Sequence, residues 1–309
     1  MTGAPQKRRI QLIVLAAAVA IAASVIGGAV YQEQPADDDN RLQVMATFYP
    51  LAYLAEEIGG EHVTVATLVP PNTEIHAWQP TTSDILAADD ADVLIYNGAH
   101  LDHWFEDDVL PALTTRGKTI VETTANASLR TISGQADPHT WVSPHTAAQQ
   151  AHAIYEAFAA RDPANASDYA DNWAQLQQRF TELDGRYQDQ FTERQKNVIF
   201  VTHAAYGYLA ERYGFEQQSV IGLSGDEQPS TSAIASLVDR MEQEDVYTIY
   251  VDPVYSDTYA DTLQRTLRQR TGREAEVLEL YLMLGPVNSL DYFEQMEANL
   301  ENLKRGLDA

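Results

Sequence analysis

The residues best suited to chemistry in this 309-residue chain are its histidines. There are eight of them and no cysteine, which excludes thiol nucleophiles, cysteine-based zinc sites and disulfides. Three of them, His76, His139 and His203, each fall where a predicted strand gives way to a helix. Neutral imidazole is a good ligand for zinc and other late divalent ions, so the three together favour a metal site. A single histidine in such a turn would more simply cap a helix or bond within a core.

The other five histidines are expected at the surface or in structural roles: His62, His100, His103, His145 and His152. The spacing of His100 and His103 could hold an ion weakly, but we predict that both lie at the surface. No Ser-His-Asp order, P-loop, GxGxxG or His-Glu-x-x-His motif accompanies the histidines. The sequence therefore offers no recognisable catalytic motif beside them.

The elements that must position these histidines alternate between short apolar runs and helical patterns, which is typical of a parallel α/β sheet. Strands are expected over 44–48, 63–69, 93–96 and 119–121, and again over 198–202, 219–221, 246–251 and 276–280. Helices are expected over 204–213, 231–242, 258–269 and 291–304 in the second half. Ligands of such sheets bind beyond the carboxyl ends of the strands, which is where the three histidines are expected.

A long helix is predicted between the two halves, because apolar residues recur every three or four positions from Tyr169 to Phe191. We interpret it as an internal spine. The predicted organisation has four parts: an anchor or signal segment with an acidic linker (1–40), an N-terminal α/β lobe (41–165), the connecting long helix (166–195) and a C-terminal α/β lobe (196–309).

The N-terminus predicts the compartment. Lys7, Arg8 and Arg9 precede an uncharged stretch, 10–30, that is long enough to cross a hydrocarbon core of about 30 Å. Basic residues before the stretch keep the N-terminus in the cytoplasm and place the rest of the chain outside. The stretch is either a permanent transmembrane anchor, which we favour, or a cleaved signal peptide.

The charge balance limits the partners. With 45 Asp and Glu against 20 Lys and Arg, the net charge is −25, which repels phosphate backbones and argues against nucleic-acid binding. Only four of the basic residues are lysines. An acidic, lysine-poor surface stays soluble in high salt, so a salt-loving source is a hypothesis.

Three segments around the histidines carry a family resemblance. Residues 70–80 (PPNTEIHAWQP), 137–141 (DPHTW) and 202–209 (THAAYGYL) resemble the three metal-ligand segments of the solute-binding proteins of zinc and manganese ABC importers, of the cluster A-I type. The resemblance covers about residues 43–306. It implies two α/β lobes joined by one long rigid helix, with the ion between the lobes and with His76, His139 and His203 as its ligands.

The fourth ligand is less well defined. The family often takes an acidic residue from the exit of the last strand, where Glu279 is the carboxylate at hand. Tyr281, Glu74 or a water molecule are the alternatives. We also expect Asp137 and Glu74 to orient the imidazole rings. Because only neutral histidine binds metal, affinity is expected to fall as the pH drops through about 6.5.

The resemblance implies capture of zinc or manganese outside the cell by a monomer that delivers it to a membrane permease with a cytoplasmic ATPase. It implies no organic cofactor and no enzyme activity. The alternatives are a zinc-dependent hydrolase with a three-histidine site and a metal-binding cell-surface adhesin. Two features depart from the family. The chain lacks a lipidated cysteine, so the N-terminal helix would act as the tether, and residues 107–136 lack the His-rich loop of zinc-specific members.

Overall fold

The computed structural model describes residues 41–132, 134–225, 229–255 and 258–309. The predicted membrane or signal helix over 10–30 lies outside these residues, so the fold says nothing about it. Within the described ranges, no helix is both long enough and apolar enough to span a bilayer.

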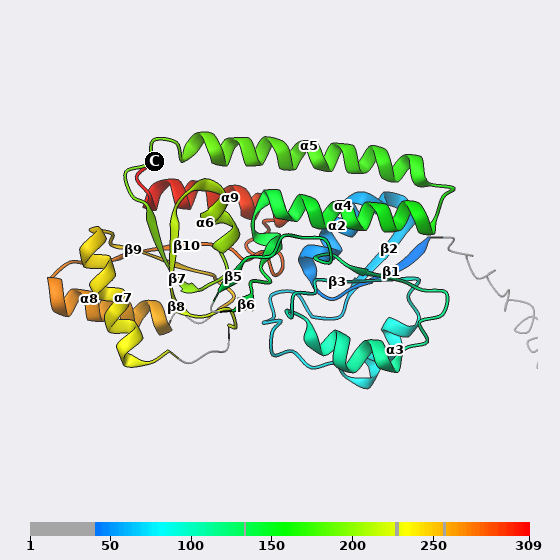
Figure 1. The fold of residues 1–309 in the computed structure, drawn as a ribbon, viewed down its shortest axis with the longest axis horizontal. Helices are drawn as coiled ribbons and strands as arrows, with labels where there is room; N and C mark the ends of the chain where they lie inside the picture. The colour runs from blue at the N-terminus through cyan, green and yellow to red at the C-terminus, as the bar shows by residue number, and fades with distance from the viewer. Residues whose placement is uncertain (1–40, 133, 226–228, 256–257) are drawn as a thin grey trace, which may run out of the picture. The chain divides into compact units, whose positions relative to one another are not determined.

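The first lobe is built on a parallel sheet in the order β2-β1-β3-β4. Its strands are β1 (Leu42–Ala46), β2 (Val63–Thr67), β3 (Val93–Tyr96) and β4 (Thr119–Glu122). Its helices are α2 (Tyr49–Gly59), α3 (Thr82–Asp89) and α4 (Pro144–Arg161), which lie on the two sides of the sheet (Figure 1). Every residue of β3 is buried, as expected of a central strand that is covered on both faces.

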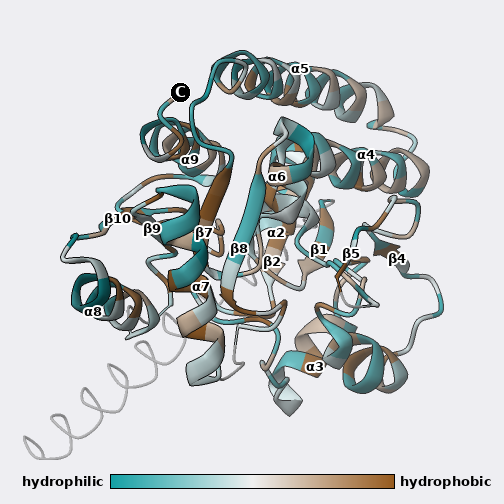
Figure 2. Cartoon of the chain, turned by 60° about the vertical axis from the view of Figure 1, so that its left-hand side comes forward, coloured by the Kyte–Doolittle hydropathy of each residue, from teal (hydrophilic) through white to brown (hydrophobic). Residues whose placement is uncertain are grey.

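The second lobe is built on another parallel sheet, in the order β10-β9-β7-β8. Its strands are β7 (Val198–His203), β8 (Glu216–Ile221), β9 (Thr248–Val251) and β10 (Glu276–Glu279). Its helices are α6 (Gly207–Tyr213), α7 (Thr231–Glu244), α8 (Thr258–Thr271) and α9 (Tyr292–Gly306). Figure 2 shows β7 as hydrophobic and the edge strand β8 as largely hydrophilic. The predicted fold class of two parallel sheets flanked by helices is confirmed.

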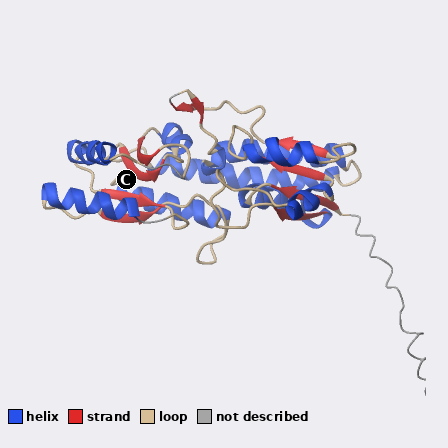
Figure 3. Ribbon diagram, turned by 90° about the horizontal axis from the view of Figure 1, so that it is seen from below, coloured by secondary structure: helices blue, strands red, loops and turns tan. Residues whose placement is uncertain are grey.

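Shorter elements complete the described chain. An antiparallel pair, β5 (Thr131–Ile132) and β6 (Gln135–Ala136), precedes the second histidine segment. Single turns of helix are η1 (Gly60–His62), η3 (Leu110–Ala112) and η4 (Thr140–Val142), and η2 (Phe105–Val109) is a π-helix. Helices flank the strands in each lobe (Figure 3).

Helix α5 (Ala166–Gln190) is the predicted long helix, and its 25 residues extend along both lobes (Figure 1). Its buried side chains form the expected stripe: Tyr169, Trp173, Leu176, Phe180, Leu183 and Tyr187. The helix packs on α2 and α4 of the first lobe and on α9 of the second. One rigid element therefore ties the two lobes together.

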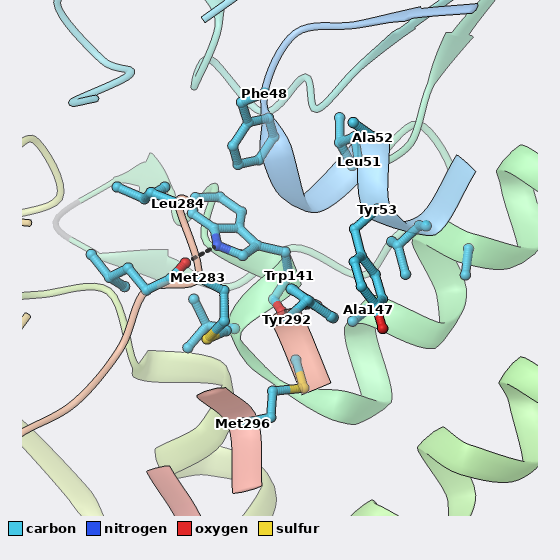
Figure 4. Packing of buried hydrophobic residues seen from close by; sticks show 14 of the residues in the cluster. Phe48, Leu51, Ala52, Tyr53, Trp141, Ala147, Met283, Leu284, Tyr292 and Met296 are labelled. Atoms are coloured by element: carbon cyan, nitrogen blue, oxygen red, sulfur yellow. Dashed lines mark hydrogen bonds between the residues drawn. The ribbon is translucent and has the colours of Figure 1, made fainter. Parts of the chain in front are cut away.

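The lobes also pack directly against each other, as the close-up in Figure 4 shows. On the side of the first lobe, Phe48 lies edge-on to Trp141, which belongs to the same lobe, with ring centroids 4.8 Å apart. The Trp141 indole donates to the Leu282 carbonyl (2.7 Å), and the Tyr292 hydroxyl donates to the Trp141 carbonyl (2.5 Å). One continuous apolar cluster includes residues of both lobes. Separating the lobes would expose this apolar surface, so the contact opposes large relative movement.

Candidate metal centre

The structure brings His76, His139 and His203 into one cluster. One potential ligand nitrogen of each lies within 4.8 Å of those of the other two. The ring centroids are 5.3 Å apart for His76 and His139, 4.9 Å for His139 and His203, and 5.9 Å for His76 and His203. Across the part of the chain that the structure describes, this is the one group of three or more His, Asp or Glu residues with this spacing.

His76 lies in the loop that follows β2, and several hydrogen bonds hold this loop in place. The Glu74 carboxylate accepts from the backbone N–H groups of His76 and Ala77, both at 2.9 Å. The indole of Trp104 donates to the Ile75 carbonyl (3.1 Å). Glu74 therefore acts on the backbone of the loop and not on an imidazole ring, which differs from the predicted role.

His139 is oriented by Asp137, as predicted. The Asp137 Oδ1 atom lies 3.0 Å from His139 Nδ1 and also accepts from the His139 backbone N–H (3.1 Å). Arg130 donates to the other carboxylate oxygen (3.2 Å), and the Tyr208 hydroxyl donates to the Asp137 carbonyl (2.7 Å). A carboxylate on one ring nitrogen fixes the tautomer and leaves the other nitrogen, Nε2, as the ligand atom.

His203 is the last residue of β7 and is buried. Its Nε2 atom lies 2.9 Å from the Leu223 carbonyl, to which it donates. The other ring nitrogen, Nδ1, therefore carries the lone pair. This Nδ1 atom is buried and has no hydrogen-bond partner among the described residues. A buried nitrogen that lacks a partner and lies beside two other imidazoles is the arrangement that a metal ion would satisfy.

The site favours the neutral form of two of its imidazoles, those of His76 and His203. Burial lowers the pKa of His76 well below its usual value, and the neighbouring His139 and His203 lower it further. Burial, followed by the charge of His139, lowers the pKa of His203 to about 3. The expectation of a transition near pH 6.5 rested on the pKa of an exposed imidazole, and burial is the reason that it does not hold for His203.

The structure does not bring the predicted fourth ligand, Glu279, into the histidine cluster. Glu279 is exposed at the end of β10, and its carboxylate accepts from the Tyr281 hydroxyl. The Glu74 carboxylate is occupied by backbone N–H groups. In the described ranges, no carboxylate oxygen shares the spacing of the three imidazoles.

Sequence reasoning missed Asp252, which directly follows β9. Its buried carboxylate accepts from the backbone N–H groups of Leu282 (2.5 Å) and Val254 (2.8 Å). It thereby fixes the segment that accepts the Trp141 indole at the contact between the lobes. Burial raises the pKa of Asp252 to about 6. An acid immediately after an apolar strand was the signal that could have identified it.

A cavity of about 380 Å³ leads to His76. His100 and His103 line it from the first lobe, and Leu223 and Ser224 line it from the second. The two additional histidines are therefore wall residues of the cavity that reaches the cluster, a location that the sequence did not indicate.

Comparison with known proteins places these features in context. The family described as "zinc-uptake complex component A periplasmic" matches residues 44–306. The chain is 28% identical over 285 residues to the high-affinity zinc uptake system protein ZnuA of Bacillus subtilis, covering 87% of this chain and 88% of that protein. It is 25% identical over 296 residues to the iron-binding protein YfeA of Yersinia pestis, covering 93% of each.

Solved structures agree with these sequence relatives. The zinc-bound ZnuA-like domain of Streptococcus pneumoniae AdcA is 26% identical, with a TM-score of 0.74. That match covers 87% of this chain and 100% of the domain.

Proposed function

Since the chain belongs to the family of periplasmic zinc-uptake complex A components, we propose that it captures a divalent transition-metal ion, zinc, and passes it to the permease of an ABC transporter. The observation that carries the proposal is the buried Nδ1 atom of His203, which has no hydrogen-bond partner in the part of the chain that the structure describes and lies beside His76 and His139. A lone pair left unpaired in a core is costly unless a ligand uses it.

The proposed ligands are Nδ1 of His203, Nε2 of His139 and one ring nitrogen of His76. Zinc in proteins is usually four-coordinate, so a fourth ligand is needed. Water supplies it in this proposal, because no carboxylate of the described chain shares the spacing of the three imidazoles. Glu279 stays a prediction, since its carboxylate does not share the spacing of the three imidazoles in the described chain.

The donor set supports zinc over manganese. Imidazole nitrogen suits zinc, whereas manganese prefers carboxylate, carbonyl and water oxygen. The three-imidazole cluster includes no carboxylate of the described chain. Relatives are named for zinc and, in one case, for iron, so the ranking of metals must be measured.

The same proposal covers location and partners. The folded part would act outside the cytoplasm as a monomer, tethered by residues 10–30 or released after their cleavage. Its partners would be a permease and a cytoplasmic ATPase, as the family of uptake-complex components suggests. A hydrolase would need a general base beside the ion. In the chain from Arg41 onward that the structure describes, the cluster holds no such carboxylate.

Zinc titration of the full-length, chelator-stripped protein at pH 7.5 tests the proposal. We expect one tightly bound ion per chain and weaker binding of manganese. His76→Ala, His139→Ala and His203→Ala should each weaken zinc binding by about 100-fold or more, because removing one of three protein ligands breaks the site. His62→Ala is the matched control, since His62 contacts Asp168 away from the cluster. Absence of stoichiometric binding would overturn the proposal.

A further inference from the structure

Two histidines outside the cluster line the same cavity as His76. They are His100, which is exposed, and His103, which is partly buried. Their ring centroids lie 5.0 Å apart, with 34° between the ring planes. A second imidazole pair therefore lies on the path from solvent to the proposed metal site.

The spacing of the pair matches the requirements of a shared metal ion. Two imidazoles bound to one tetrahedral zinc ion have ring centres about 5 Å apart, since each zinc–nitrogen bond is about 2 Å long. The inner cluster has centroid distances of 4.9, 5.3 and 5.9 Å. The 5.0 Å distance between His100 and His103 falls in the same range.

The backbone holds the pair in an unusual turn. Gly98, Ala99 and His100 have φ angles of 79°, 51° and 66°. Two of the three are not glycine, and such residues each cost on the order of 1 kcal/mol at positive φ. The buried Asp102 carboxylate stabilises the turn by accepting from the backbone N–H groups of Asn97 (2.7 Å) and Gly98 (2.9 Å).

Neighbouring residues determine which side chains of this segment reach the cavity. Leu101 and Trp104 are buried in the core, so His100 and His103 are the residues of the turn that remain available to the cavity. Glu106, Asp107 and Asp108 follow directly and are exposed. Their negative charge attracts cations to this exposed part of the chain, which follows the turn in sequence.

The outer pair and the inner cluster share one cavity. His100, His103 and His76 all line it. A cation held by the outer pair would therefore be close to the inner cluster.

We propose that His100 and His103 form a second, weaker divalent-metal site at the mouth of the cavity. It takes an ion from solvent, with water completing the coordination, and hands it to the inner cluster. The proposal rests on the proposed capture function. Two protein ligands bind more weakly than three, so transfer runs inward along the affinity gradient.

Zinc titration and stopped-flow loading of the full-length protein test this site. The unmodified protein should bind one zinc ion tightly and a second weakly. The double variant His100→Ala/His103→Ala should keep the tight ion, lose the weak one and load about tenfold more slowly, as expected when local cation capture is removed. His203→Ala should lose the tight ion and keep the weak one.

The double variant His62→Ala/His152→Ala is the matched control, because it removes two imidazoles that do not line this cavity. It should leave both binding events and the loading rate unchanged. If His100→Ala/His103→Ala still binds the tight ion but also keeps the weak zinc-binding step and the loading rate of the unmodified protein, the proposed outer site is wrong. If the unmodified protein binds no zinc ion tightly, the proposed capture function is wrong instead.

Discussion

The two lobes share one strand order but carry different residues at corresponding positions. In each sheet the first strand lies between the second and the third, and the fourth lies at the edge. Ala46 of β1 pairs with Ile95, and Val201 of β7 pairs with Tyr250, each the penultimate residue of the third strand. Two residues further along are Phe48 in the first lobe and His203 in the second.

This difference separates packing from binding. Phe48 packs on Trp141 within the first lobe, and the Trp141 indole in turn donates to the Leu282 carbonyl of the second lobe. His203 at the corresponding position has a buried nitrogen with no hydrogen-bond partner within the described ranges. The two histidines of the first lobe lie in loops instead. The contact between the lobes keeps all three imidazoles close together. The scaffold is repeated, whereas the binding chemistry depends on which side chain stands at the strand end.

Replacing His203 should give the largest effect on binding. His203→Ala should weaken zinc binding by about 1,000-fold, because one of three protein ligands is lost. The free energy of unfolding of the metal-free protein should fall less than in Phe48→Ala. The variant loses the hydrogen bond to the Leu223 carbonyl, but it also removes a buried nitrogen that has no partner among the described residues. Competition with a chromophoric chelator and denaturant unfolding measure the two quantities. A large loss of unfolding free energy with unchanged zinc affinity would mean that His203 acts in packing and not in binding.

Replacing Phe48 should have the opposite profile. Phe48 is 1% exposed, and Phe48→Ala should lower the free energy of unfolding by about 4 kcal/mol through the cavity that it leaves. At a temperature where the variant remains folded, zinc affinity should stay within about threefold of the unmodified protein. Phe48→Leu is the matched control and should lose less stability. Equal losses in both variants would contradict a packing role.

The buried carboxylate of Asp252 predicts a pH dependence. Its pKa of about 6 in the folded protein is above the usual value of 3.8, so the folded state favours the protonated form. The contribution of protonated Asp252 to the stability of the folded state is present below pH 4 and is lost as the pH rises to about 6. Relative to the unmodified protein, Asp252→Asn should therefore gain up to about 3 kcal/mol of unfolding free energy between pH 4 and pH 7.

Denaturant unfolding of the metal-free unmodified protein and of metal-free Asp252→Asn, each at four pH values, measures this difference in unfolding free energy. The chemical change leaves a constant offset from altered hydrogen bonds, so the slope with pH is the informative quantity. A difference that stays flat or falls with pH would contradict the raised pKa.

Replacing the residue that orients His139 should give the smallest effect. Asp137→Asn should weaken zinc binding by about 10- to 100-fold, because His139 keeps its place but loses the carboxylate on Nδ1. Glu279→Gln is the matched control and should leave affinity unchanged if water completes the coordination. A loss in Glu279→Gln as large as that in a histidine variant would return Glu279 to the ligand set.

The sequence predicted what depends on local pattern. Apolar runs identified the buried strands, and the three-to-four spacing identified α5. The edge strand β8 was predicted too short, because its first half, Glu216 to Gln218, is polar and partly exposed. Strand edges with one solvated face lack the continuous apolar signal.

The site was predictable only in part, because some of its geometry depends on packing in three dimensions and not on the local sequence pattern. His76, His139 and His203 stand at strand-to-helix turns that can be located from the chain. Glu279 is the last residue of β10, and its distance from the three imidazoles depends on how the sheets pack in three dimensions, so it could not be excluded from its sequence position. The turn at Ala99 and His100 has positive φ angles, which alanine and histidine seldom adopt, so the residue types do not predict it.

X-ray absorption spectroscopy of the zinc-loaded full-length protein at the zinc K-edge would identify the atoms bound to the ion. We expect three imidazole nitrogens and one oxygen at about 2.0–2.1 Å, with one imidazole fewer in His203→Ala. A first shell dominated by carboxylate oxygen, or one that is unchanged in His203→Ala, would contradict a site built from histidines of both lobes.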